Sequence, residues 1–222
     1  MQKKERFQRF IDHFVAIQPE PETELVYTDP YQLMVAVMLS AQCTDKRVNL
    51  LTPAFFQRFP DVKSLSEASV QEVFELIKSC SYPNSKSNHL IGMAQMLVKD
   101  FNSTVPEDIE DLQKLPGIGR KSANVIASVV FAKPAMAVDT HVFRVSQRIG
   151  LTTHPKNPYD AEMQLVRHIP EQYIPKAHHW LILHGRYVCQ ARKPKCGECE
   201  ISAICKFFHE NEKKKNTILN KS

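Results

Sequence analysis

The sequence predicts an all-α protein. Apolar residues recur at intervals of three and four along most of the 222 residues, which is the spacing of a buried helix face. No stretch shows a convincing alternation of apolar and polar residues, the pattern of a half-buried strand. Most of the 14 prolines stand between the periodic segments. With 43% hydrophobic residues, the chain can bury the core of one large or two modest helical domains.

The periodic segments define the expected helices in order. Residues 4–17 form the first, and 29–42 form an almost wholly apolar second helix that opens with Asp-Pro, a typical helix start. In the third, 44–59, Pro53 is expected to lie in the first turn or to break the helix. The polar segment 211–222 is expected to be disordered. We expect the other helices at 69–80, 84–101, 106–115, 120–132, 139–149, 158–168, 171–184 and 200–208.

Charge and hydropathy restrict the class of protein. Lys and Arg number 29 against 24 Asp and Glu, a net charge of +5, which suits a polyanionic partner and equally suits a soluble enzyme with a solvated basic face. No signal-peptide pattern opens the sequence, and apolar runs such as 33–39 are too short to cross a bilayer. We therefore expect a soluble, cytoplasmic protein that does not contact a membrane.

The stretch "LPGIGRKSANV", residues 115–125, predicts a phosphate-binding turn between two helices. Two glycines let the backbone approach a ligand closely, and the helix that follows points its unpaired N–H groups and positive dipole end the same way. We expect Gly117, Ile118, Gly119 and Arg120 to contact the phosphates of a nucleic acid. The alternative is an ordinary helix–helix turn with a glycine cap.

Lys121 follows this turn at the start of the next helix. The positive field there disfavours an ammonium, and a neutral amine is what attack on a sugar carbon needs; the alternative is a charged phosphate clamp. A helix over 121–132 rises roughly 16 Å at about 1.5 Å per residue. The proline-containing segment after it can return about 20 Å at about 3.3 Å per residue, which would bring Asp139 beside Lys121. Asp139 is otherwise a plain N-cap for the helix that follows it.

The strings "LPGIGRKSANVI" and "AVDTHVFRV" are similar to the endonuclease III family of DNA glycosylases, whose hairpin is the helix-hairpin-helix motif. The resemblance implies that Lys121 and Asp139 are the catalytic pair. It also implies two helical domains with a cleft between them. A six-helix barrel with the hairpin is expected over 22–132, an iron–sulfur domain over 1–21 and 133–211, and a polar tail over 212–222.

The function that the resemblance implies is a bifunctional DNA glycosylase and abasic-site (AP) lyase that removes oxidised pyrimidines. The damaged nucleotide flips out of the duplex, Lys121 displaces the base and forms a Schiff base, and β-elimination cuts the strand on the 3′ side. We expect damaged double-stranded DNA as partner, no nucleotide cofactor, and a monomer. The alternatives are an adenine-mismatch glycosylase, whose branch lacks this lysine, and a noncatalytic DNA-binding module with a redox-sensing cluster.

Four of the six cysteines lie within residues 189–205, spaced C-x6-C-x2-C-x5-C. In a reducing compartment such a group suggests a metal site more than disulfides, and spacing alone does not separate zinc from an iron–sulfur cluster. The spacing resembles the cluster signature of the endonuclease III family and so implies a [4Fe–4S] cofactor with a structural or redox-tuning role. Its ligands are expected to be Cys189, Cys196, Cys199 and Cys205.

The loop between the first two of these cysteines is basic. Arg192, Lys193 and Lys195 would present a basic edge to phosphates if the cluster fixes the loop, and a solvated charged loop is the alternative. The other two cysteines, Cys43 and Cys80, have apolar neighbours and are expected to be ordinary buried thiols.

A flipped nucleotide leaves a gap in the duplex that side chains must fill. "LSAQCTD", residues 39–45, resembles the family segment whose glutamine enters the base stack, here Gln42, although a polar residue at a helix end is the alternative. In "CSYPNSK", Tyr82 stands at the wedge position where the family usually has leucine, and Pro83 beside it changes the loop.

Three further residues are expected near the DNA. Asn84 and Lys86 are expected to bind phosphate, with capping of the following helix as an equal alternative for Asn84. His141, two residues after Asp139, is expected to line the base pocket or to pack in the core.

Overall fold

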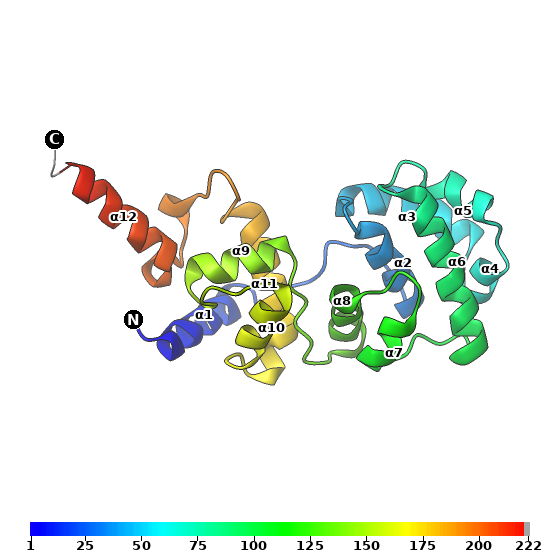
Figure 1. Ribbon diagram of the computed structural model, residues 1–222, viewed down its shortest axis with the longest axis horizontal. Coiled ribbons are helices and arrows are strands. Elements are labelled where there is room, and N and C mark those ends of the chain that lie inside the picture. Colours follow the sequence, from blue (N-terminus) through cyan, green and yellow to red (C-terminus); the bar gives the residue numbers. More distant parts are fainter. Residues whose placement is uncertain (220–222) are drawn as a thin grey trace. The chain divides into compact units, whose positions relative to one another are not determined.

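The computed structural model describes residues 1–219, and every regular element in that part of the chain is a helix (Figure 1), which confirms the all-α prediction. The chain divides into two compact units. The middle unit is Thr23–Lys133, and the terminal unit joins Met1–Glu22 to the chain from Pro134 onward. None of the described helices combines the length and the apolar character needed to span a membrane.

The middle unit is built around α2 (Pro30–Ser40), which packs against α3, α6 and α8. Asp29 starts this helix because its carboxylate accepts the backbone N–H of Gln32 at 2.9 Å. Eight of its eleven residues are buried, so α2 is apolar on every side and forms the middle of the core. The other helices of the unit are α3 (Asp45–Arg58), α4 (Val62–Ser66), α5 (Val70–Ile77), α6 (Pro83–Asp100), α7 (Ile109–Lys114) and α8 (Arg120–Phe131).

The helices α4 and α5 both lie against the long helix α6. Each begins with a capping box, formed by Asp61 with Ser64 in α4 and by Ser69 with Glu72 in α5. The helix α4 was not among those expected, because five residues are too few for a periodic pattern.

The helix α3 differs from the prediction at Pro53, which neither breaks it nor lies in its first turn. Proline has no N–H, so the carbonyl of Asn49, four residues earlier, loses its helical donor. Asn49 is half-buried, and its side chain bonds to the backbone of Glu24 and Val26. Water reaches this part of α3, so the helix tolerates the missing bond.

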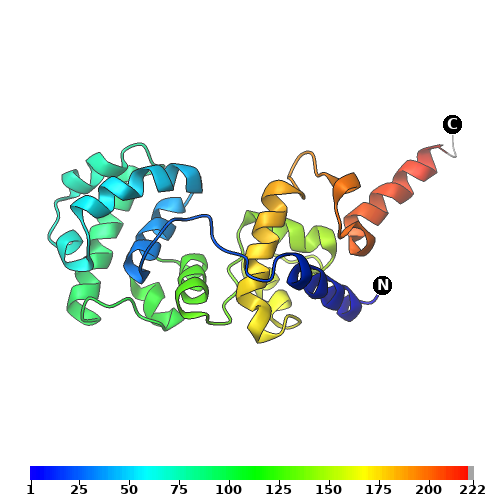
Figure 2. The same ribbon diagram turned by 180° about the vertical axis from the view of Figure 1, so that it is seen from behind.

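The terminal unit has its core between α1 (Lys3–Ile17) and α11 (Ile174–Tyr187), two helices drawn in Figure 2. They carry the buried aromatic side chains of the unit, Phe7, Phe10, Phe14 and Trp180. Trp180 is fully buried, stacks on Phe14 and meets Phe10 edge-on. Its Nε1–H donates to the carbonyl of Gln18 at 2.8 Å, so the polar edge of the indole is paired. The remaining elements are α9 (Thr140–Ile149), α10 (Pro158–Val166), η1 (Glu171–Tyr173), η2 (Cys196–Glu198), η3 (Ser202–Ile204) and α12 (Lys206–Leu219).

The C-terminal segment is more helical than predicted. A short helix near 200–208 and disorder from 211 were expected, whereas α12 runs from Lys206 to Leu219. Glu210 lies 3.7 Å from Lys206 one turn earlier, a spacing that supports an exposed helix. Residues 220–222, which belong to the expected tail, lie outside the described residues.

Candidate functional site

The hairpin turn between α7 and α8 is shaped by Gly117. Its φ is +80°, and a Cβ on it would lie 2.8 Å from both His89 Cβ and Met38 Cε. The N–H of Ile118 donates to Leu115 O at 3.0 Å, and the Ile118 side chain is buried. The expectation that Ile118 contacts phosphate is therefore wrong for its N–H and its side chain, since both serve the turn.

Gly119 has a different role from Gly117. It is exposed and caps α8 with an ordinary φ of −90°, and a Cβ on it would meet nothing within 4 Å. No side chain caps the N-terminus of α8, so the positive end of this helix is open to a ligand. Packing does not require a glycine here, so its suitability as an N-cap and the close approach that it allows a ligand are the physical reasons for one.

Replacing the two glycines is expected to lower stability by different amounts. Gly117→Ala should lower the free energy of unfolding by about 2–4 kcal/mol, because it adds left-handed strain and two close contacts. Gly119→Ala should lower it by less than about 1 kcal/mol, the cost of a weaker cap. Urea unfolding of both variants tests this, and equal losses would contradict the assigned roles.

The predicted catalytic residues occupy helix starts in different units. Lys121 is exposed in the first turn of α8. Asp139 is half-buried and caps α9, with its Oδ1 accepting the N–H of Val142 at 2.7 Å. The N-cap reading of Asp139 is therefore correct. One carboxylate can both cap a helix and act in chemistry, because the cap uses a single oxygen lone pair.

Two loops of the middle unit expose the side chains expected to enter the duplex. Gln42 follows α2 and Tyr82 precedes α6; both are exposed, Tyr82 to 64%, and both have a left-handed backbone, with φ of 54° and 56°. Asn84 is also exposed, but no side-chain cap is formed at the start of α6, so the capping alternative for Asn84 is wrong.

Lys86 does not lie where a phosphate contact requires it. Its side chain is only 7% exposed, and its Nζ donates to the carbonyls of Leu39 and Ala41 at 2.7 and 2.8 Å. The expectation that Lys86 contacts a phosphate is wrong, because its ammonium is buried and hydrogen-bonded inside the protein.

His141 packs within the terminal unit. It is half-buried on α9, its Nδ1 lies 3.2 Å from Arg144 Nη2, and it faces Gly185, where an added Cβ would come within 3.0 Å of His141 Cβ. These contacts favour the packing alternative for this residue.

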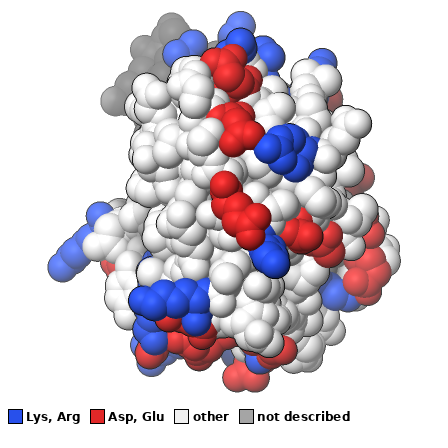
Figure 3. All heavy atoms as spheres, turned by 90° about the vertical axis from the view of Figure 1, so that its right-hand side faces the viewer, with Lys and Arg blue, Asp and Glu red and all other residues white. Residues whose placement is uncertain are grey.

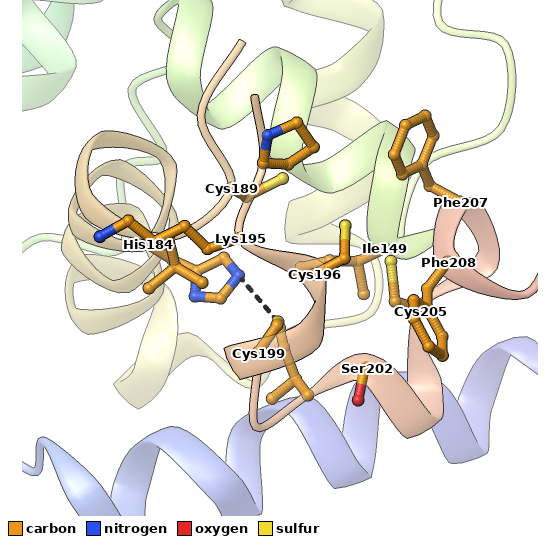
Figure 4. A pocket seen from close by; sticks show the side chains of 13 residues that line it. Ile149, His184, Cys189, Lys195, Cys196, Cys199, Ser202, Cys205, Phe207 and Phe208 are labelled. Carbon is orange, nitrogen blue, oxygen red and sulfur yellow. Dashed lines mark hydrogen bonds between the residues drawn. The ribbon is translucent and has the colours of Figure 1, made fainter. Parts of the chain in front are cut away.

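The four cysteines of the 189–205 segment line one pocket, and Figure 4 shows their side chains arranged around it. Apolar side chains complete the wall, among them Ile149, Ile201, Phe207 and Phe208. In residues 1–219 no three His, Cys, Asp or Glu side chains are grouped closely enough for a metal ion. Four thiols that line one pocket are a donor set for either a zinc ion or an iron–sulfur cluster.

Known proteins share both motifs. The family model described as "HhH-GPD superfamily base excision DNA repair protein" matches residues 35–171, and the "Iron-sulfur binding domain of endonuclease III" matches residues 189–205. Endonuclease III of Rickettsia felis is 46% identical over 191 residues, which is 86% of this chain and 89% of that protein. Endonuclease III of Escherichia coli K12 is 42% identical over 189 residues, 85% of this chain and 89% of that protein. This chain belongs to the endonuclease III family.

A solved structure agrees with this assignment. The chain matches a trapped endonuclease III–DNA covalent intermediate, an estranged-adenine complex, with a TM-score of 0.89 and 35% identity over 96% of this chain and 100% of that one. As a member of the endonuclease III family, the protein is a base excision repair DNA glycosylase with AP lyase activity. It carries a [4Fe–4S] cluster, as the sequence predicted.

The donor set of this protein fits the cluster chemically. Burial raises the pKa of the Cys199 thiol to about 11 and also raises the pKa of Cys205, so both hold their protons when no metal is bound. A metal cluster supplies the positive charge that converts them to thiolates in this apolar pocket. His184, whose pKa is lowered to about 4 by burial, is neutral there, and its Nε2 lies 3.7 Å from Cys199 Sγ (Figure 4).

Two arginines beside the cluster segment were not predicted. Arg148 donates to the carbonyls of Gln190 and Ala191 at 2.7 and 2.8 Å, and Arg144 donates to the carbonyls of Gly185 and Cys189. Their spacing of four residues places them on one side of α9. This spacing is the feature of the sequence from which their shared role could have been predicted. They hold the start of the basic loop, while the three cationic residues of that loop stay exposed, namely Arg192, Lys193 and Lys195.

Charged side chains on the middle unit are mixed in sign. The face turned to the viewer in Figure 3 shows acidic and basic groups side by side on a largely uncharged surface. Several cations of the unit are paired, as in Arg58–Glu72 at 2.6 Å and Lys78–Glu75 at 2.8 Å. On the face seen in Figure 3, the described residues therefore do not form a continuous basic surface for phosphates.

Proposed function

We propose that this enzyme excises oxidised pyrimidines from duplex DNA through an amine nucleophile and cuts the strand on the 3′ side of the abasic site. The observation that carries the proposal is Lys121, an exposed amine in the first turn of a helix whose N-terminus is open. An amine in this position is reachable by a sugar carbon and is a residue type that forms covalent intermediates. The trapped covalent complex of a relative supports it, because a covalent intermediate needs a protein nucleophile.

Lys121 is the proposed nucleophile of the reaction, and Asp139 is the proposed charge-stabilising residue. The lone pair of Lys121 Nζ bonds to C1′ of the flipped nucleotide, and the base leaves with the electrons of its glycosidic bond and takes up a proton. Asp139, ionised, stabilises the positive charge that develops on the sugar. Nζ then loses a proton to solvent, O4′ takes up a proton as the C1′–O4′ bond breaks, and the nitrogen lone pair forms the C1′=N bond of a Schiff base. A C2′ proton passes to solvent, its C–H electron pair forms a C2′=C3′ double bond, and the 3′ phosphate leaves with the electron pair of the C3′–O bond.

The duplex is proposed to meet this protein at three places. The turn at Gly117 and Gly119, with Arg120 beside it, is proposed to hold one phosphate. Gln42 and Tyr82 are proposed to fill the gap left by the flipped nucleotide, since both are exposed on short loops. Further phosphate contacts are assigned to Asn84, Arg192, Lys193 and Lys195, all exposed.

The cluster ligands are proposed to be the four cysteines that line the pocket, Cys189, Cys196, Cys199 and Cys205. Four thiolates leave the cluster no open position for substrate, so its proposed role is structural. When bound, it would join the chain at Cys189, the segment with Cys196 and Cys199, and the chain at Cys205, and would fix the basic loop between the first two cysteines. We further propose a cytoplasmic, DNA-associated monomer that needs no nucleotide cofactor, with the two-domain division expected from the sequence, residues 22–132 against 1–21 and 133–211.

Borohydride trapping tests the proposal. The protein is incubated with a duplex that contains one thymine glycol or one abasic site, borohydride is added, and products are separated by denaturing electrophoresis. We expect a covalent protein–DNA adduct from both substrates, because borohydride reduces a Schiff base to a stable amine. Base release without an adduct would indicate a monofunctional glycosylase, and binding without either product would indicate a noncatalytic module.

A further inference from the structure

Lys86 is a buried lysine with all its contacts inside the protein. It lies in the first turn of α6, and its Nζ contacts Leu39 O at 2.7 Å, Ala41 O at 2.8 Å and Cys80 Sγ at 3.2 Å. An ammonium has three donors, so these three acceptors satisfy it without a carboxylate partner. A buried charge is costly unless it is fully hydrogen-bonded. The buried Lys86 ammonium meets this condition, because each of its three N–H donors has an acceptor.

The two carbonyls belong to the C-terminal end of α2. This end leaves carbonyls without helical donors and carries the negative end of the helix dipole. No basic residue of α2 itself lies in its last turn. The Lys86 ammonium therefore caps α2 from another helix, where both hydrogen bonding and dipole favour a cation.

The same contacts join two loops, residues 41–43 and 80–82, which we call the loop pair and which expose Gln42 and Tyr82. The Ser81 hydroxyl donates to Gln42 O at 2.6 Å, and the Cys80 thiol donates to Leu39 O at 3.3 Å. Each loop holds a non-glycine residue in the left-handed region, Gln42 and Tyr82. Such residues persist only where their surroundings hold them, and Lys86 lies between the two segments and bonds to both.

We propose that Lys86 is a positioning residue that holds the loop pair as one rigid unit, so that Gln42 and Tyr82 enter the duplex together when a nucleotide flips. The proposal rests on the proposed function, in which these two side chains fill the gap. Lys86 is buried and has no part in the bonds to the reacting sugar. It lowers the cost of extruding the nucleotide by presenting both side chains already ordered.

The test compares substrates that do and do not need extrusion. Lys86→Met keeps the length of the side chain and removes the ammonium, and Lys99→Met, at an exposed site of the same helix, is the matched control. Ser81→Ala removes only the hydroxyl bond between the loops. Rates of borohydride adduct formation are measured on an abasic site in a duplex and on the same strand without its complement, after thermal melting has established folding.

We expect Lys86→Met to slow adduct formation on the duplex by about tenfold or more, and on the single strand by less than about twofold. Ser81→Ala should show the same selective loss at smaller size, and Lys99→Met should match the wild type on both substrates. Equal losses on the two substrates, or no loss on the duplex, would overturn the role of Lys86.

If Lys86→Met does not fold, Ser81→Ala decides the outcome alone, and a Ser81→Ala variant without selective loss overturns the proposal. A wild type that forms no adduct on either substrate refutes the proposed function and the role of Lys86 with it. A wild-type adduct combined with unselective variants refutes only the positioning role.

Discussion

Lys121→Arg is expected to abolish the borohydride adduct and to slow strand cleavage by about 10³-fold or more. Arginine keeps the positive charge at the start of α8 but stays protonated at any pH that the protein survives, so it has no lone pair to attack C1′. Denaturing electrophoresis of the trapped products and of the cleaved strand gives both values. Because the side chain is exposed, the variant should fold as the wild type does.

Substitution of Lys121 by arginine separates phosphate binding from nucleophilic attack, whereas alanine would remove both. A lysine that only clamps phosphate can be replaced by arginine with much of the activity retained, since guanidinium binds phosphate at least as well. An active Lys121→Arg enzyme would therefore assign the lysine to binding. Lys114→Arg, at an exposed lysine that pairs with Asp111 at the end of α7, is the matched control and should leave both readouts unchanged.

The hairpin could be predicted from the sequence because its signals are local. The φ of Gly117, the open cap at Gly119 and the start of α8 all depend on residues within a few positions. The same holds for Asp29 and Asp139, whose carboxylates cap the helices that directly follow them.

Residues whose role depends on packing between distant segments were not predicted correctly. In the sequence "NSKSN", Lys86 has the polar neighbours of a surface cation. In the structure it binds the C-terminal carbonyls of α2, which lie more than forty residues before it in the chain, and so it caps that helix inside the protein. Arg144 and Arg148 likewise acquire their role from the backbone near Cys189, again more than forty residues away.

The position of Pro53 was also predicted incorrectly. Pro53 stays inside α3 because its turn is open to solvent, and the rule that proline breaks a helix does not take solvent exposure into account.

Asp139→Asn is expected to slow base release by about 10²–10⁴-fold while DNA binding is retained. The ionised carboxylate stabilises positive charge on the sugar and activates the amine, and a neutral amide does neither. Asparagine is as good an N-cap as aspartate, so the bond to Val142 N–H and the start of α9 should survive. Single-turnover release of thymine glycol from a duplex, together with a binding isotherm on the same duplex, measures the two quantities.

Comparison with Asp139→Ala separates the cap from the chemistry. Alanine removes both, so it should lower the free energy of unfolding by about 1 kcal/mol and slow base release as much as asparagine does. If the carboxylate serves only as a cap, the asparagine variant would release base at the wild-type rate and the alanine variant would lose stability alone. Because the cap engages Oδ1 and a carboxylate has a second oxygen, the structural and catalytic roles of Asp139 are compatible in one side chain.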